Sequence, residues 1–198
     1  MIIIGMCGGT CSGKTTISNR LKQLFENNIS VVSIDNYYIA HPELPIEERK
    51  NINYDEPNSI DVSRLIEDLK SLKSGHKIVQ PVFSYKTFLN EFSDNTTYPE
   101  KVIIVEGLFA FSFPELVDMY DFKIFIDADA DIRLSRRISR DLTIYNRPLD
   151  FVMKQYFDYA KPMHDLHVEP KKSIADITIS GNFINDKVYE LILKLVSV

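Results

Sequence analysis

The sequence predicts an α/β fold in which helices cover both faces of a doubly wound, parallel, five-stranded sheet. Three observations lead to this prediction. Short apolar runs rich in Val and Ile alternate with amphipathic segments along most of the chain. The first run ends in a glycine-rich loop, and two later runs, at residues 29–34 and 102–105, each end directly before an acidic residue. Alternating strands and helices favour parallel pairing, which places the carboxyl ends of the strands at one edge of the sheet.

The chain has 198 residues, of which 44% are hydrophobic and 26% are charged, and we expect a single domain spanning 1–198. The net charge of −5 argues against a surface that binds nucleic acid. No apolar run reaches the length of a membrane span, and the first residues lack the charged region of a secretion signal. We therefore expect a cytoplasmic protein without a membrane or nucleic-acid partner.

The first strand is expected at residues 1–6, a continuous apolar run that is typical of a strand buried on both faces. A helix at 14–25 follows, because Ile17 and Leu21 recur at helical spacing. The sequence Ile-Ser-Val-Val-Ser-Ile then predicts the second strand at 29–34.

A long polar segment at 41–58 contains three prolines, and we expect a loop that carries a short helix. An amphipathic helix follows at 60–72, with Asp61 or Ser59 as its N-cap. Residues 77–98 then change to strand-like alternation and predict an inserted β-hairpin. The remaining elements are strands at 102–105, 122–126 and 174–179 and helices at 113–120, 132–142, 149–159 and 186–196.

The glycine-rich loop matches the phosphate-binding pattern of glycine, four residues and then Gly-Lys-Ser/Thr, which indicates a P-loop NTPase fold. Gly8 and Gly13 let the backbone curl so that successive N–H groups can donate to a phosphate. Lys14 can reach the β- and γ-phosphates, and Thr15 can offer its hydroxyl to Mg²⁺. We therefore predict a nucleoside triphosphate site at Gly8, Gly9, Thr10, Cys11, Ser12, Gly13, Lys14, Thr15 and Thr16.

Two carboxylates follow predicted strands and are expected beside this loop. Asp35 can accept the proton of an attacking hydroxyl or hold Mg²⁺ through water; the alternative is an acid that caps a turn. Glu106 follows four β-branched residues, the Walker-B arrangement, which predicts a Mg²⁺ site shared with Thr15. An apolar run followed by an acidic residue is common in proteins. The Walker-B interpretation of Glu106 therefore depends on the position of this run among the alternating strands and helices.

Four arginines form one stripe on the helix predicted at 132–142, within an arc of about 100°. Guanidinium groups on one stripe suit a triphosphate, and we expect catalytic roles for Arg137 and Arg140. The alternative, a solvated face paired with nearby aspartates, suits Arg133 and, to a lesser degree, Arg136. Arg147 lies in segment 141–148, which we expect to close as a lid that excludes water. The stripe consists of Arg133, Arg136, Arg137 and Arg140.

Together these residues resemble the uridine kinase branch of the uridine kinase/phosphoribulokinase family of P-loop kinases, over nearly the whole chain. The phosphate loop is the most specific of the matching stretches. The other stretches indicate the family only when they are taken together. The matching stretches are 8–16, Asp35-Asn36-Tyr37-Tyr38, Asn53-Tyr54-Asp55-Glu56-Pro57, 105–111, 125–134, Arg136-Arg137, Arg140-Asp141, Gln155-Tyr156, 161–164 and Glu169-Pro170.

The resemblance implies a role for each matching position. Asp35 corresponds to the general base at a nucleoside 5′-hydroxyl, and Thr15 with Glu106 to the Mg²⁺ site. Arg140 and Arg147 correspond to positions on the phosphate side or in the lid. The family also implies ATP or GTP as donor, Mg²⁺ as metal and a homo-oligomer, a tetramer. The substrate-side positions are Asp35, Tyr38, Asp55, Phe83, Phe88, Arg137 and Gln155.

The predicted hairpin, at 77–98, departs from the family pattern. The family typically carries a Tyr, a His and an Arg that recognise the pyrimidine, whereas Phe83, Phe88 and Asn90 stand here. Each change removes a hydrogen-bonding group, which is worth about 1–3 kcal/mol of discrimination. In the expected lid, the family's Arg-Gly-Arg corresponds to Tyr145-Asn146-Arg147, with one guanidinium fewer.

Three functions remain open on the sequence. The first is transfer of a γ-phosphoryl group to the 5′-hydroxyl of uridine or cytidine, a step of pyrimidine salvage. The second is the same chemistry on a different small alcohol, which the hairpin favours and Asp55 disfavours. The third is a nucleotide-binding regulatory module without turnover. The base Asp35 and the absence of the Asn-Lys-x-Asp motif of GTP switches argue against this third function.

Overall fold

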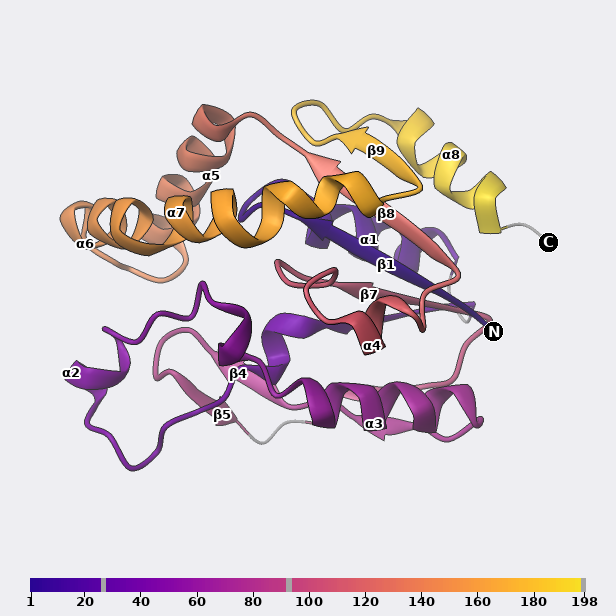
Figure 1. Cartoon of the computed structure of the whole chain (residues 1–198), viewed down its shortest axis with the longest axis horizontal. Helices are drawn as coiled ribbons and strands as arrows, with labels where there is room; N and C mark the ends of the chain where they lie inside the picture. The colour runs from indigo at the N-terminus through magenta and orange to yellow at the C-terminus, as the bar shows by residue number, and fades with distance from the viewer. Residues whose placement is uncertain (26–27, 92–93, 197–198) are drawn as a thin grey trace.

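The computed structural model describes residues 1–25, 28–91 and 94–196 of the chain (Figure 1). Within these residues, the centre is a five-stranded sheet with the strand order β2-β7-β1-β8-β9. Its four pairings are all parallel, as the sequence predicts. The strands are β1 (Ile2–Gly8), β2 (Ile29–Ser33), β7 (Val102–Glu106), β8 (Phe122–Asp127) and β9 (Ile177–Ser180).

The parallel register aligns the carboxyl ends of the strands that carry the predicted site. Glu106, at the end of β7, pairs with Met6 of β1 and with Ser33 of β2. Gly8, the last residue of β1, pairs with Ile126 of β8. Because these strands point the same way, the loops that follow them meet at one edge of the sheet, where ligands bind in this architecture.

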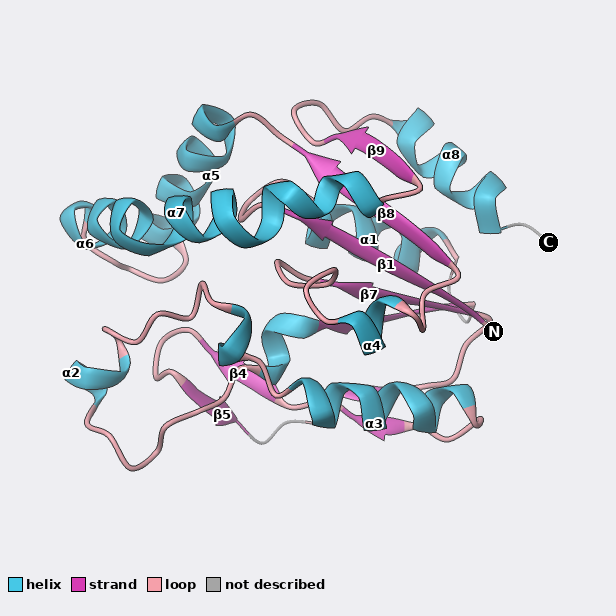
Figure 2. Ribbon diagram, viewed as in Figure 1, coloured by secondary structure: helices cyan, strands magenta, loops and turns pink. Residues whose placement is uncertain are grey.

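Alternate residues of β1 pack into two separate cores on opposite faces of the sheet. Ile3 belongs to a core that includes Leu65 of α3, and Ile4 to one that includes Ile17 of α1 and Ile192 of α8. A continuous apolar run is what a strand covered on both faces requires. Figure 2 shows the helices around the sheet. They are α1 (Lys14–Leu24), α2 (Ile46–Arg49), α3 (Val62–Lys73), α4 (Pro114–Val117), α5 (Ala130–Thr143), α6 (Leu149–Gln155), α7 (Lys161–Met163) and α8 (Asp186–Val196).

The inserted hairpin is built in two tiers. Its base pairs β3 (Ile78–Val79) with β6 (Thr96–Thr97), and its outer part pairs β4 (Val82–Ser84) with β5 (Leu89–Glu91), both antiparallel. The break falls at Gln80 and Pro81, where proline cannot donate to a ladder. The sequence predicts the hairpin but not this second pairing, and residues 92 and 93 of its return path lie outside the described residues.

The Gln80 side chain ties the base of the hairpin to the edge strand β2. Its Nε2 donates to the Val31 carbonyl at 2.9 Å and to Thr97 Oγ1 at 2.6 Å. Its Oε1 accepts from the Ser33 backbone N–H at 3.3 Å. An amide side chain has both donors and an acceptor, so Gln80 pairs with β2 much as a strand would.

Several element boundaries differ from the sequence prediction. Ile34 does not end β2; it begins a 3₁₀ turn, Ile34–Tyr37, that carries Asp35. The helix expected at 149–159 instead continues through two wide π-helical turns and a final 3₁₀ turn to Ile174. Pro162 and Pro170 lie within this run, and the missing N–H of a proline removes an α-helical hydrogen bond, which accounts for the irregular turns. As a result, β9 begins at Ile177 rather than at residue 174.

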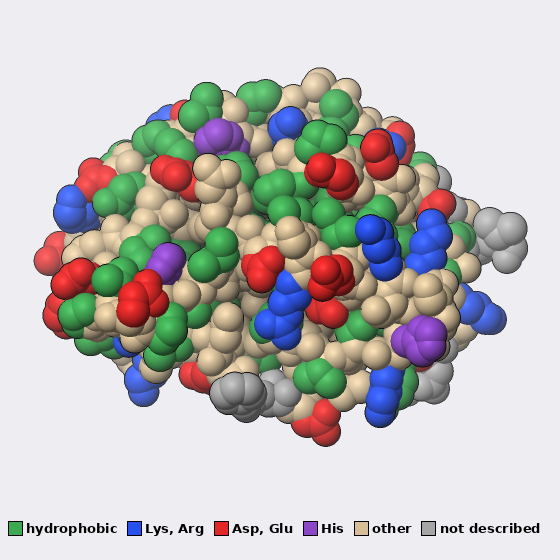
Figure 3. Space-filling view, turned by 60° about the horizontal axis from the view of Figure 1, so that its bottom comes forward, with side chains coloured by type: hydrophobic (Ala, Val, Ile, Leu, Met, Phe, Trp, Pro, Cys, Tyr) green, Lys and Arg blue, Asp and Glu red, His purple; other side chains and the backbone are tan. Residues whose placement is uncertain are grey.

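Charged side chains of both signs are mixed on the face of the molecule that Figure 3 shows. On the face in Figure 3, Lys and Arg side chains lie among Asp and Glu side chains rather than in one basic field, in keeping with the net charge of −5. Among the helices of the described residues, none combines the length and the apolar character needed to cross a membrane.

Candidate active site

The loop between β1 and α1 has the curled backbone that a phosphate needs. Gly13 has φ 108° and Gly8 has φ 151°, and a Cβ atom at Gly8 would lie 2.3 Å from the Ile126 carbonyl oxygen. The buried Lys14 Nζ donates to the carbonyls of Gly8 and Gly9 at 2.9 and 3.0 Å, which holds the curl from inside. The φ of Cys11 is also positive, at 57°. This conformation directs successive N–H groups to one side.

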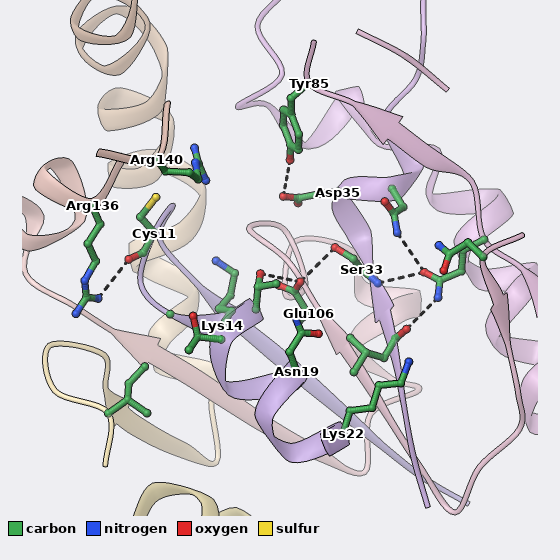
Figure 4. A pocket seen from close by; sticks show the side chains of 18 of the residues that line it. Cys11, Lys14, Asn19, Lys22, Ser33, Asp35, Tyr85, Glu106, Arg136 and Arg140 are labelled. Atoms are coloured by element: carbon green, nitrogen blue, oxygen red, sulfur yellow. Dashed lines mark hydrogen bonds between the residues drawn. The ribbon is translucent and has the colours of Figure 1, made fainter. Parts of the chain in front are cut away.

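A large cavity of about 740 Å³ opens at this loop (Figure 4). Cys11, Gly13, Lys14, Thr15 and Thr16 line it. A second cavity of about 120 Å³ lies beside it, and Thr10 forms part of its wall. Gly8, Gly9 and Ser12 line neither cavity and instead build the turn behind the loop, in which the Ser12 N–H donates to the Gly9 carbonyl.

Glu106 and Thr15 come together as the sequence predicts. Glu106 Oε1 accepts from Thr15 Oγ1 at 3.0 Å and from Ser33 Oγ at 3.2 Å (Figure 4). Burial raises the pKa of the Glu106 carboxyl, and the negative charge of Asp35 adds to the effect while Lys14 opposes it. Glu106 is therefore a carboxylate whose ionised form needs a further cation.

This pair suits Mg²⁺, which in phosphoryl-transfer sites takes only one or two protein ligands and fills the rest with phosphate oxygens and water. Within the described residues, no cluster of three or more His, Cys, Asp or Glu side chains could hold a metal by itself. Thr15 and Glu106 are thus the residues that would hold Mg²⁺, in the presence of a triphosphate.

Asp35 lies where the two cavities meet. Its carboxylate Oδ2 accepts a hydrogen bond of 2.8 Å from the Tyr85 hydroxyl (Figure 4). Its Oδ1 is buried and has no hydrogen-bond partner among the described residues. Both cavities share a wall, which consists of Cys11, Lys14, Thr15, Asp35, Tyr85, Glu106 and Arg140.

Aromatic rings enclose the smaller cavity. The rings of Tyr54 and Phe88 are stacked with centroids 5.7 Å apart, and those of Tyr38 and Phe83 lie 5.1 Å apart. Phe88 adopts a positive φ of 55° at the turn of the hairpin, an unusual conformation for a bulky residue. The ring faces offer stacking surfaces to a planar ligand. Three of the predicted substrate-side residues, Tyr38, Phe83 and Phe88, therefore meet around one cavity.

The polar substrate-side residues lie on the same cavity. Asp55 and Gln155 line it together with Arg137. Burial raises the pKa of the Asp55 carboxyl, which Arg137 partly offsets. Gln155 Nε2 donates to the Lys50 carbonyl at 3.0 Å, so its amide is already engaged. Asn90, in contrast, lines a third cavity and is not among the residues that line this one.

A single buried aspartate gathers three of the predicted arginines. Asp141 is 1% exposed and lies 2.8 Å from Arg140, 3.6 Å from Arg147 and 3.8 Å from Arg137. Arg147 also donates from Nη2 to the Tyr85 carbonyl at 2.8 Å and lies over the rings of Phe88, Tyr145 and Phe151. Segment 141–148 thus contacts the hairpin directly.

The expectation that Arg133 and Arg136 lie on a solvated face is wrong. Arg133 is buried, donates from Nε to the Ala128 carbonyl at 2.9 Å and packs against Gly9, where a Cβ atom would lie 2.7 Å from its Nη1. Arg136 donates to the carbonyls of Gly181 and Asn182 at 2.8 and 2.9 Å. Both guanidinium groups donate to backbone carbonyls at the sheet edge rather than pairing with the helix aspartates in the described residues.

Sequence reasoning missed two residues that shape the site. The Tyr85 hydroxyl holds Asp35, and Ser33 donates to Glu106 from the neighbouring strand. Ser33 could have been found from its place beside a predicted acidic strand end. Tyr85 offered no such signal, because it lies in the turn of the hairpin rather than at the end of a strand of the central sheet.

A phosphate-binding loop, a Walker-B carboxylate and a second carboxylate that face joined cavities define a P-loop phosphotransferase that uses ATP and an alcohol acceptor. The chain belongs to the phosphoribulokinase/uridine kinase family, whose model matches residues 3–186.

Two curated relatives are similar over most of the chain. A uridine kinase from Chlamydia pneumoniae is 40% identical over 184 residues, which cover 92% of this chain and 83% of the relative. A uridine kinase from Staphylococcus haemolyticus (strain JCSC1435) is 42% identical over 178 residues, which cover 89% of this chain and 86% of the relative. A solved structure described as a possible uridine kinase from Bacillus stearothermophilus is similar in fold, with a TM-score of 0.59, 21% identity, and coverage of 90% of this chain and 88% of that one.

Proposed function

We propose that the protein is a nucleoside kinase that transfers the γ-phosphoryl group of ATP or GTP to the 5′-hydroxyl of uridine or cytidine. The similarity to uridine kinases at 40% and 42% identity supports this activity. The observation that supports it most directly in the site is the position of Asp35, which lines both the cavity at the phosphate loop and the aromatic cavity.

On the donor side, the loop backbone and Lys14 bind the phosphates of the nucleotide. Lys14 Nζ now donates to two loop carbonyls, and it lies where the β- and γ-phosphates are expected. Mg²⁺ held by Thr15 and Glu106 would neutralise charge that develops on the transferred group. Arg140 lines both cavities, so its guanidinium group can stabilise the negative charge on the phosphoryl group as it passes from donor to acceptor.

On the acceptor side, Asp35 removes the proton from the 5′-hydroxyl as the oxygen attacks the γ-phosphorus. Its Oδ1 is buried without a hydrogen-bond partner among the described residues, a costly state that a substrate hydroxyl relieves. Asp55 and Arg137 lie on the same cavity and are proposed to bind the ribose hydroxyls and orient the sugar. Tyr38, Phe83 and Phe88 are proposed to pack against the base.

The segment 141–148 is proposed to exclude water as a lid. Water would otherwise compete with the 5′-hydroxyl for the γ-phosphoryl group. Arg147 joins this segment to the hairpin through the Tyr85 carbonyl and through the ring of Phe88. Binding of the acceptor against the hairpin can therefore favour closure of the lid.

The activity is tested by incubating the protein with Mg-ATP and uridine and identifying the product by ³¹P NMR. The proposal predicts uridine 5′-monophosphate and ADP in equal amounts, and loss of the product in Asp35→Asn. An Asp35→Asn variant that retains wild-type turnover would show that Asp35 is not the base.

A second candidate is phosphorylation of another small alcohol, such as a sugar phosphate. Two observations favour it: Phe83 and Phe88 offer no hydrogen bond to a base, and the aromatic cavity measures only about 120 Å³. Asp55, which corresponds to the family's ribose-binding carboxylate, favours the nucleoside instead. A screen of nucleosides and small alcohols by ADP release separates the two candidates.

A further inference from the structure

Tyr85 is the one side chain that donates a hydrogen bond to Asp35 within the described residues. Its hydroxyl lies 2.8 Å from Asp35 Oδ2, and in Figure 4 the ring points from the hairpin directly at the carboxylate. The two residues are 50 positions apart and come from different elements. The hairpin thus reaches the acidic end of β2, in addition to lining the acceptor cavity.

We propose that Tyr85 is a positioning residue, which holds Oδ2 of Asp35 so that Oδ1 faces the acceptor hydroxyl. This inference rests on the proposed role of Asp35 as general base. A carboxylate with two equivalent oxygens can rotate, and only one oxygen can take the proton in a given pose. A fixed donor on Oδ2 selects the other oxygen and removes that freedom before the substrate arrives.

The Tyr85 ring is itself held on several sides. It lies 5.6 Å from the Phe83 ring and 6.4 Å from the Tyr38 ring, both edge-on, and 5.4 Å from the tilted ring of Tyr145. Arg147 Nη2 donates to its backbone carbonyl at 2.8 Å. A side chain packed in this way has little rotamer freedom, so its hydroxyl is a fixed reference point for Asp35.

The chemistry of a buried phenol suits this role better than that of a charged donor. Burial, and then the negative charge of Asp35, raise the pKa of Tyr85 well above its usual value. The phenol therefore keeps its proton throughout the neutral range and acts only as a donor. A lysine or arginine at this position would instead neutralise the negative charge that makes the Asp35 carboxylate a base.

This arrangement gives each proton and electron pair of the transfer a defined destination. The acceptor hydroxyl gives its proton to Asp35 Oδ1, the new O–P bond forms, and the bond between the γ-phosphorus and the bridging oxygen breaks. The bridging oxygen leaves with the electron pair as part of ADP. Tyr85 neither gains nor loses a proton, and its hydrogen bond to Oδ2 persists through the step.

The test replaces Tyr85 by phenylalanine, which keeps the ring and removes only the hydroxyl. With Mg-ATP and uridine we expect kcat to fall on the order of 10- to 100-fold, as for loss of a hydrogen bond to a charged group. We expect KM for both substrates to stay within about twofold, since phenylalanine keeps the ring in the wall of both cavities and the lost hydroxyl is bonded to Asp35. Tyr98→Phe is the matched control, because Tyr98 follows the same hairpin with 55% of its surface exposed.

A second measurement separates positioning from a merely structural role. In an Asp35→Asn background, Tyr85→Phe should cause little further loss of kcat, because the Tyr85 hydroxyl then has no carboxylate base to position. The slow residual transfer of this background is followed over hours. An unchanged kcat, a raised kcat, or a loss that appears mainly in KM would overturn the inference. If Asp35→Asn itself retained full turnover, the proposed function of Asp35 would fail, whatever Tyr85→Phe does.

Discussion

The Thr15 hydroxyl donates a 3.0 Å hydrogen bond to Glu106 Oε1, across 91 positions of the chain. Two features of the fold produce this contact. The parallel register sets Glu106 level with Met6 of β1 and Ser33 of β2, and the curled loop returns α1 to the same edge. Ser33 then adds its own hydrogen bond to the same oxygen. The contact therefore joins the phosphate loop to the strand that carries the proposed metal ligand.

Replacing Glu106 by glutamine should lower activity while stabilising the protein in the absence of ligands. Loss of the carboxylate should lower kcat on the order of 100-fold and raise the Mg²⁺ concentration needed for half-maximal rate. Glu115→Gln, on the exposed side of α4, is the control for loss of a negative charge. A Mg²⁺ requirement that does not change would contradict the assignment.

The stability effect follows from the direction of the pKa shift. The pKa of Glu106 in the folded protein is raised above the ordinary 4.5, so the folded state binds more protons than the unfolded state between the two values. Stability therefore falls as pH rises through that interval, and the full cost is present above it. Glu106→Gln removes this cost, so Tm at pH 7 should rise and its pH dependence above 4.5 should flatten. A Tm below the wild type at pH 7 would contradict this account.

Asp141→Asn should be strongly destabilising. The Asp141 carboxylate is 1% exposed and lies within 4 Å of three arginines, so removal of its charge takes away the buried carboxylate that pairs with all three guanidinium groups. We expect a loss of about 3–5 kcal/mol in the free energy of unfolding, measured in urea. Asp131→Asn, an exposed position on the same helix, should change it by less than about 0.5 kcal/mol. Similar values for both variants would show that the arginine cluster contributes little.

Arg147→Lys should loosen the proposed lid rather than disable the chemistry. A lysine keeps the charge but cannot present a planar group to the rings of Phe88 and Tyr145, which lie 5.4 and 5.2 Å from the guanidinium carbon. We expect hydrolysis of ATP by water to increase. ADP release without acceptor should therefore rise, and with acceptor present less than one nucleotide product should form for each ADP released. Arg20→Lys, an exposed position on α1, is the control. Tight coupling in Arg147→Lys would exclude a role for this contact in keeping out water.

The aromatic cavity predicts weak discrimination between pyrimidine bases. Phe83 and Phe88 provide stacking surfaces, and Asn90 faces a separate cavity, so the hairpin presents few groups that read a base edge. We therefore expect kcat/KM for uridine and cytidine to differ by less than about tenfold. Ratios above about 100-fold would show that a polar group of this cavity reads the base edge, and would contradict the prediction.

The placement of the proposed donor-side residues follows from the sequence more fully than that of the acceptor-side residues, for a physical reason. The phosphate loop is a local pattern, and Asp35 and Glu106 follow strands whose parallel register brings their ends together. Tyr85, in contrast, contacts Asp35 from a hairpin whose base is tied to β2 by the Gln80 side chain. Alternation of polar and apolar residues predicts a strand, but it does not predict a side-chain contact of this kind.

The arginine stripe shows the same limit. Its helical periodicity was sufficient to place the four arginines on one side of α5. The direction in which that side faces depends on how α5 packs. Arg133 turned out to pack on Gly9, with its partner a backbone carbonyl that no pattern of charged residues could indicate.

The most direct measurement of the central claim is a screen for ADP release from Mg-ATP with nucleosides and small alcohols as acceptors. It is combined with ³¹P NMR of each product and repeated with Asp35→Asn. We predict that uridine and cytidine give the highest kcat/KM, that the product carries phosphate on the 5′-oxygen, and that Asp35→Asn leaves only slow residual transfer. A non-nucleoside alcohol that is preferred over every nucleoside, or ADP release that no acceptor stimulates, would contradict the account.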